Sequence, residues 1–170
     1  MKIVLIMVGV LMVLVVGVVA IGALLPKRHV IARSALFKAA PERLFALVAG
    51  SQDWRPDVKS CELFTEDGGR QFQRETSKHG DTILYELLES RPPVFIQRRI
   101  ATEDLPFGGS WNFALEPVNG GTRVTITEDG EVYNPLFRFA SKFILGQTAT
   151  QDAYLAAMGR AMGEDVQPEN

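Results

Sequence analysis

Residues 109–130 read GSWNFALEPVNGGTRVTITEDG, and this stretch decides the fold. Trp111, Phe113 and Leu115 alternate with residues that are small or polar. A period of two places successive side chains on opposite faces of a β-strand. The Asn-Gly-Gly sequence at 119–121 is typical of a tight turn, and a second alternating run follows it. The stretch therefore predicts a β-hairpin with one apolar face.

The same alternation continues on the amino-terminal side of this hairpin. It recurs in four segments separated by turn sequences, at residues 59–66, 71–76, 83–87 and 94–101. A further β-type segment, residues 29–37, precedes them. We therefore expect a seven-stranded antiparallel sheet that buries one face.

Helical periodicity appears on both sides of these strands. After the first strand, Pro41 begins a short amphipathic helix, and residues 52–58 are expected to form a second one. The last segment is predicted to be one long helix from Pro135 to Met162, with Asn134 as its N-cap. This order predicts an α+β fold in which the sheet wraps around the long C-terminal helix.

A single helix cannot fill the whole concave face of a twisted seven-stranded sheet. We therefore expect a cavity between the sheet and the C-terminal helix. Gly146 lies near the middle of this predicted helix, where the missing side chain would leave room for a ligand.

The amino terminus has a different composition. Ile3 to Leu25 is a run of 23 uncharged residues, mainly Val, Leu and Ile. As a helix it would span about 34 Å, enough for a hydrocarbon core of about 30 Å. We predict a single-pass anchor in the cell membrane; a cleaved signal peptide is the alternative. Lys27, Arg28 and Arg33 follow the span, so the positive-inside rule places the next domain in the cytoplasm.

The chain thus divides into a membrane anchor with a basic flank at 1–28, a folded domain at 29–163 and a disordered tail at 164–170. A formal net charge of −2 disfavours a nucleic-acid binder, which would carry a basic excess. One cysteine and two histidines exclude an intramolecular disulfide, a cysteine zinc site and a multi-histidine centre. We expect no metal and no cofactor, and we favour a monomer.

Several motifs in this order resemble a known family. They are residues 29–46 with their Ala-Pro-Glu sequence, Trp-Arg-Pro-Asp at 54–57, and residues 109–117, 120–125 and 128–131. Together they resemble the START-like (SRPBCC) superfamily with its helix-grip fold, and within it the polyketide cyclase/dehydrase and lipid-transport family. The resemblance implies a cavity for a lipid, quinone or polyketide-like molecule between sheet and C-terminal helix. It implies no particular reaction, because a fold does not determine chemistry.

Candidate ligand contacts are apolar and aromatic side chains of the inner face and the last helix, with two polar groups among them. They are Trp54, Tyr85, Trp111, Phe113, Glu128, Phe137, Ile144 and Met158. Period-two geometry points the Glu128 carboxylate toward the apolar face, where it could act as an acid or base, although we favour a structural role. No catalytic residue is assigned: His79 is expected at a hairpin tip, and Cys61 has no histidine near it in the sequence.

Three functions fit these expectations. The first is a membrane-anchored domain that binds an apolar ligand and takes it from, or presents it to, the bilayer. The second is a cyclase or dehydrase acting on an apolar carbonyl substrate, which a buried, unpaired Glu128 beside open volume would favour. The third is an interaction module of a membrane complex with a filled core. A wide cavity without titratable groups would favour the first.

Overall fold

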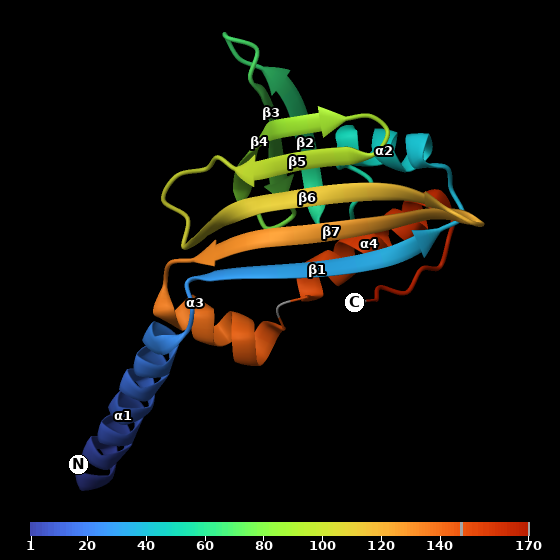
Figure 1. Cartoon of the computed structure of the whole chain (residues 1–170). Helices are drawn as coiled ribbons and strands as arrows, with labels where there is room; N and C mark the ends of the chain where they lie inside the picture. The colour runs from blue at the N-terminus through green and yellow to red at the C-terminus, as the bar shows by residue number, and fades with distance from the viewer. Residues whose placement is uncertain (147, 170) are drawn as a thin grey trace.

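The sheet has the predicted architecture. The computed structural model describes residues 1–146 and 148–169, with the backbone alone at residue 145. Seven antiparallel strands lie in the order β1-β7-β6-β5-β4-β3-β2, so that the first strand pairs with the last (Figure 1). They are β1 (Arg28–Phe37), β2 (Val58–Thr65), β3 (Gln71–Ser77), β4 (Thr82–Arg91), β5 (Phe95–Ile100), β6 (Phe107–Val118) and β7 (Gly121–Val132). The predicted seven-stranded antiparallel sheet is confirmed.

The register places the predicted apolar positions on one inner face. Phe113 of β6 lies opposite Ile96 of β5 on one side and Ile126 of β7 on the other. Residues directly opposite each other in an antiparallel pair share a face of the sheet. These three side chains are buried, and they form the core with residues of β1 and two helices, α2 (Pro41–Ala49) and α4 (Ala149–Met162).

The C-terminal helix is broken, which corrects the prediction of one long element. It comprises α3 (Pro135–Ala140), a π-helical turn η1 (Ser141–Leu145) and α4, and Gly146 ends η1 with φ of 79°. A left-handed backbone is tolerated by glycine and cannot continue a right-handed helix. The Asn134 cap is confirmed, because its side chain accepts a hydrogen bond from the Leu136 amide at 2.8 Å. The second short helix is also absent: residues 53–57 form turns.

The C-terminal segment, predicted to be a disordered tail, instead packs against the domain. Glu164 accepts hydrogen bonds from the amides of Lys38 and Ala39, and Val166 is buried against the core. Glu169 exchanges two backbone hydrogen bonds with Ser34 of β1. Residues 164–169 therefore pack against the domain, and Glu169 forms an isolated antiparallel bridge with Ser34 at the edge strand β1. The last residue of the expected tail, 170, lies outside the described residues.

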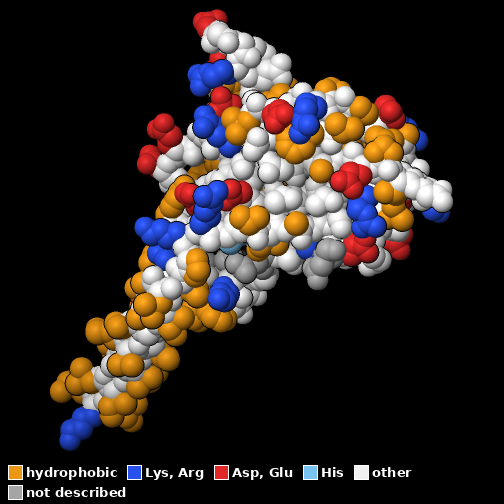
Figure 2. Space-filling view, viewed as in Figure 1, with side chains coloured by type: hydrophobic (Ala, Val, Ile, Leu, Met, Phe, Trp, Pro, Cys, Tyr) orange, Lys and Arg blue, Asp and Glu red, His pale blue; other side chains and the backbone are white. Residues whose placement is uncertain are grey.

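The amino-terminal helix projects from the domain. α1 (Lys2–Leu24) is long and apolar enough to cross a membrane: its most apolar stretch has a mean hydropathy of 3.3 and is not buried by the rest of the chain. Figure 2 shows hydrophobic side chains along its length and basic side chains near its junction with the domain. Its last turn contacts the domain, where Gly22 is buried beneath α3.

Candidate functional site

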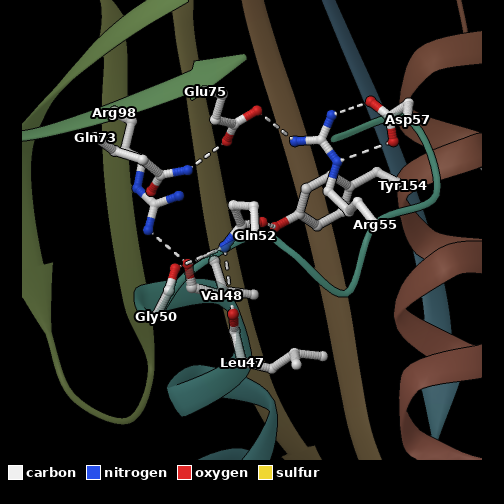
Figure 3. Close-up of polar contacts among 10 residues, drawn as sticks. All are labelled: Leu47, Val48, Gly50, Gln52, Arg55, Asp57, Gln73, Glu75, Arg98 and Tyr154. Atoms are coloured by element: carbon white, nitrogen blue, oxygen red, sulfur yellow. Dashed lines mark hydrogen bonds and ion pairs between the residues drawn. The ribbon is translucent and has the colours of Figure 1, made fainter. Parts of the chain in front are cut away.

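A buried glutamine organises the end of α2. The Gln52 amide nitrogen donates to the carbonyls of Val48 at 3.0 Å and Gly50 at 2.9 Å, and more weakly to that of Leu47 (Figure 3). These acceptors belong to the last turn of the helix, where carbonyls have no partner within the helix. The remaining Gln52 oxygen accepts from the Tyr154 hydroxyl at 2.7 Å, which ties α4 to the end of α2.

Tyr154 is the centre of an aromatic cluster. Its ring centroid lies 5.3 Å from those of Trp54 and Phe113 and 5.8 Å from that of Trp111. Three predicted contact residues therefore meet, on a tyrosine that the sequence analysis missed. Helical spacing indicated this position, because Tyr154 lies four residues before Met158 and therefore on the same face of α4. These packed rings lie between β6 and α4, in the region where the cavity was expected.

Charged side chains lie beside this cluster on the inner face of the sheet. Arg55 pairs with Glu75 at 2.8 Å and with Asp57, and Gln73 donates to Glu75 (Figure 3). Arg98 is buried and donates to the carbonyl of Val48. The strand register places Arg98 opposite Trp111, on the inner face of the sheet.

Burial controls the ionisation of the two inner tyrosines. Desolvation raises the pKa of Tyr154 and of half-buried Tyr85 well above 10, although nearby Arg55 and Arg98 act in the opposite direction. Burial also lowers the pKa of Arg98. Both phenols therefore remain neutral hydrogen-bonding groups at physiological pH.

We expect these two tyrosines to resist alkaline titration in the folded protein. Their folded pKa lies above the unfolded value, so the stability they contribute is complete below about pH 10 and falls as the pH rises beyond it. Ultraviolet absorbance should show exposed Tyr133 ionising first and the other two only with unfolding. Tyr133→Phe should remove the early step, and early ionisation of all three tyrosines would contradict the prediction.

A pocket of about 250 Å³ lies beside the charged cluster. It lies between the end of α2 and strands β2 to β5, and its walls include Phe72, Leu87 and Ile96. Arg98 and Gln73 supply polar groups. The Gln73 side-chain oxygen is buried and has no hydrogen-bond partner among the described residues. An unpaired buried acceptor is costly, so a donor from a bound molecule would be stabilised there.

The other predicted contact residues lie elsewhere. Met158 is fully buried in the core. Glu128 Oε1 lies 3.2 Å from His29 Nε2, where the start of β1 pairs with the end of β7. Phe137 and Ile144 are 48% and 71% exposed, in the part of the chain that precedes Gly146. The break at Gly146 separates them from α4, whereas an unbroken helix would have aligned them with Met158.

Comparison with known proteins identifies the family of the folded domain. A family model described as polyketide cyclase/dehydrase and lipid transport matches residues 28–163. No curated protein matches the chain. Among solved structures, a START superfamily protein from Mycobacterium smegmatis aligns with 18% identity and a TM-score of 0.61 over 79% of this chain and 98% of that one.

Two more distant structures share the fold. Protein MLL2253 from Mesorhizobium loti is 12% identical, with a TM-score of 0.61, over 79% of this chain and 97% of that one. The di-domain ARO/CYC StfQ from the steffimycin biosynthetic pathway is also 12% identical, with a TM-score of 0.62. The match covers 80% of this chain but 52% of StfQ. Identities this low establish a shared fold and leave the chemistry open.

Proposed function

Because the chain belongs to the polyketide cyclase/dehydrase and lipid-transport family, we propose that it binds an apolar molecule with a polar end at a membrane surface. The START-like fold supports a hydrophobic small molecule as the ligand class. The pocket between α2 and strands β2 to β5 is the proposed binding site. A lipid, a quinone or a polyketide-like compound has the required chemistry.

The lining of this pocket is the observation that carries the proposal. Six of the eleven described residues in its lining are apolar, and the other five are polar, among them Arg98 with its guanidinium donors and Gln73 with its unpaired oxygen. Ligand pockets commonly combine an apolar lining with a few such polar groups. A volume of about 250 Å³ accommodates a ring or headgroup, and the open side leaves room for a chain to extend outward.

The same lining favours a binder over an enzyme. Among the described residues that line the pocket, Arg98 is the one ionisable group, and a guanidinium is a poor general base at neutral pH. The carboxylate of Glu75 is held by Arg55 and Gln73, and Glu128 faces His29 rather than the pocket. These pairings support structural roles for both carboxylates.

The proposed location is the cell membrane, with α1 as a single-pass anchor. Its apolar surface is uncovered by the domain, and Lys27 and Arg28 follow it directly. The positive-inside rule places the domain in the cytoplasm. An anchored binder would exchange its ligand with the adjacent bilayer rather than carry it through solution.

Filling the pocket tests the proposal. Leu87→Trp adds bulk on the lining, and Leu88→Trp adds the same bulk at the neighbouring exposed residue. Native mass spectrometry of the full chain, released from detergent after purification, should detect a retained apolar molecule. We expect Leu87→Trp to lose most of it and Leu88→Trp to keep it. A wild-type chain that carries no ligand, or equal occupancy in both variants, would contradict the proposed site.

A further inference from the structure

The segment between β7 and α4 exposes an apolar surface that the domain leaves uncovered. We call it the α3–η1 surface, and it comprises Leu136, Phe137, Phe143 and Ile144, which are 46% to 71% exposed. The Phe143 ring also contacts that of Phe139, and Lys142 lies over it at 5.8 Å. Large exposed side chains on consecutive helical turns indicate a contact surface rather than scattered exposure.

The position of this surface relative to α1 is fixed by direct contacts. Arg138, itself buried, donates to the carbonyls of Leu25 at 2.8 Å and Ala23 at 3.4 Å. It thereby caps the C-terminal end of α1, where a cation also interacts favourably with the helix dipole. The backbone of Pro135 packs against Gly22 so closely that any Cβ there would overlap the Pro135 carbonyl.

These contacts determine how deep α3 would lie in a bilayer that α1 spans. Gly22 is two residues from the end of α1, which corresponds to about 3 Å along the helix axis. α3 therefore begins level with the last turn of α1 and runs across its end rather than along it (Figure 1). In a membrane-spanning helix, that level is the boundary between hydrocarbon and headgroups.

We propose that the α3–η1 surface lies in the headgroup region of the bilayer as a second, shallow membrane contact. The inference rests on the proposed role of α1 as an anchor. Phenylalanine and leucine beside lysine are typical of segments that lie in this region, with basic groups reaching the headgroups. The bilayer is the favoured occupant because the surface is continuous with α1, so inserting the anchor brings the two together. The contact would hold the folded domain in a fixed orientation on the membrane.

Lipid-borne quenchers test this contact in the full chain. Single cysteines at Val13, Ile144 and Val118, in a Cys61→Ser background, would carry an environment-sensitive fluorophore. All three replaced side chains are exposed. The labelled protein would be reconstituted into phosphatidylcholine vesicles containing spin-labelled phosphatidylcholine. We expect the probes at Val13 and Ile144 to lose most of their emission and the probe at Val118 to keep it.

The outcomes separate this inference from the anchor on which it rests. Quenching at Val13 without quenching at Ile144 would overturn the shallow contact and leave the anchor intact. An Ile144 probe that shifts to the blue but is unaffected by the lipid quencher would indicate coverage by a second copy or another protein, which also overturns it. Absence of quenching at Val13 would overturn the anchor itself.

Substitutions at two glycines of α1 test the contact between α1 and α3. Gly22→Val would force Pro135 away from α1, whereas Gly17→Val meets open space on the same helix. We expect Gly22→Val to reduce quenching of the Ile144 probe while the Val13 probe remains quenched. Gly17→Val should change neither. Unchanged quenching at Ile144 in Gly22→Val would show that this junction does not position the segment.

Discussion

Tyr154→Ala is expected to reduce the free energy of unfolding by about 3–5 kcal/mol, the range for removing a large buried aromatic side chain. Its ring contacts Trp54, Trp111 and Phe113, so its loss opens a cavity beneath β6 that these rings cannot fully close. The deletion also leaves the Gln52 oxygen without its hydrogen bond. Denaturant unfolding of the full chain in mild detergent, followed by tryptophan fluorescence, measures the change.

Tyr154→Phe separates packing from hydrogen bonding at the same position. It keeps the ring contacts and removes the hydroxyl, so the expected loss is about 1–3 kcal/mol, the cost of an unsatisfied buried polar group. An alanine variant no less stable than the phenylalanine variant would show that the aromatic cluster does not hold α4 against the sheet.

Glu75→Ala is expected to cost about 1–3 kcal/mol, because it leaves Arg55, in a mostly buried position, with the exposed carboxylate of Asp57 as its remaining ion-pair partner. The side chains of Glu75 and Arg55 are 10% and 16% exposed. The loss also frees the Gln73 amide, which donates to Glu75. Denaturant unfolding in the same detergent measures the change in the free energy of unfolding. Native mass spectrometry should also show less retained ligand, because the wall of the pocket next to Gln73 relaxes.

Glu62→Ala on the neighbouring strand is the matched control. Glu62 pairs with Arg74 at 2.6 Å, but these side chains are 63% and 46% exposed. An exposed pair contributes about 0–1 kcal/mol, since water and salt screen it. Similar losses for both variants would contradict the importance of burial at Glu75.

The strands were predictable because their evidence is local. Alternation at Trp111, Phe113 and Leu115 requires one buried face whatever surrounds it, and turn sequences at 119–121 limit the strand ends. The N-cap at Asn134 was predictable for the same reason, since it involves residues only two positions apart. The length of α1 is likewise a property of composition alone.

The site was only partly predictable. Trp54, Trp111 and Phe113 were expected to contact a ligand, and the structure brings them together, but around Tyr154 rather than around open space. Phe137 and Ile144 were assigned to the same cavity because helical spacing aligned them with Met158. The π-helical turn η1 and the positive φ of Gly146 remove that alignment.

The sequence by itself determined the antiparallel sheet, the apolar amino-terminal helix and the family, because each is encoded in neighbouring residues or in an ordered set of motifs. Only the tertiary structure decided where charge and open volume lie. The Arg55–Glu75 pair, the Tyr154–Gln52 hydrogen bond and the Arg138 cap on α1 join residues 20, 102 and 113 positions apart. Such contacts depend on strand register and on the path after Gly146, and the free energy that selects them comes from packing the whole domain rather than from any local pattern.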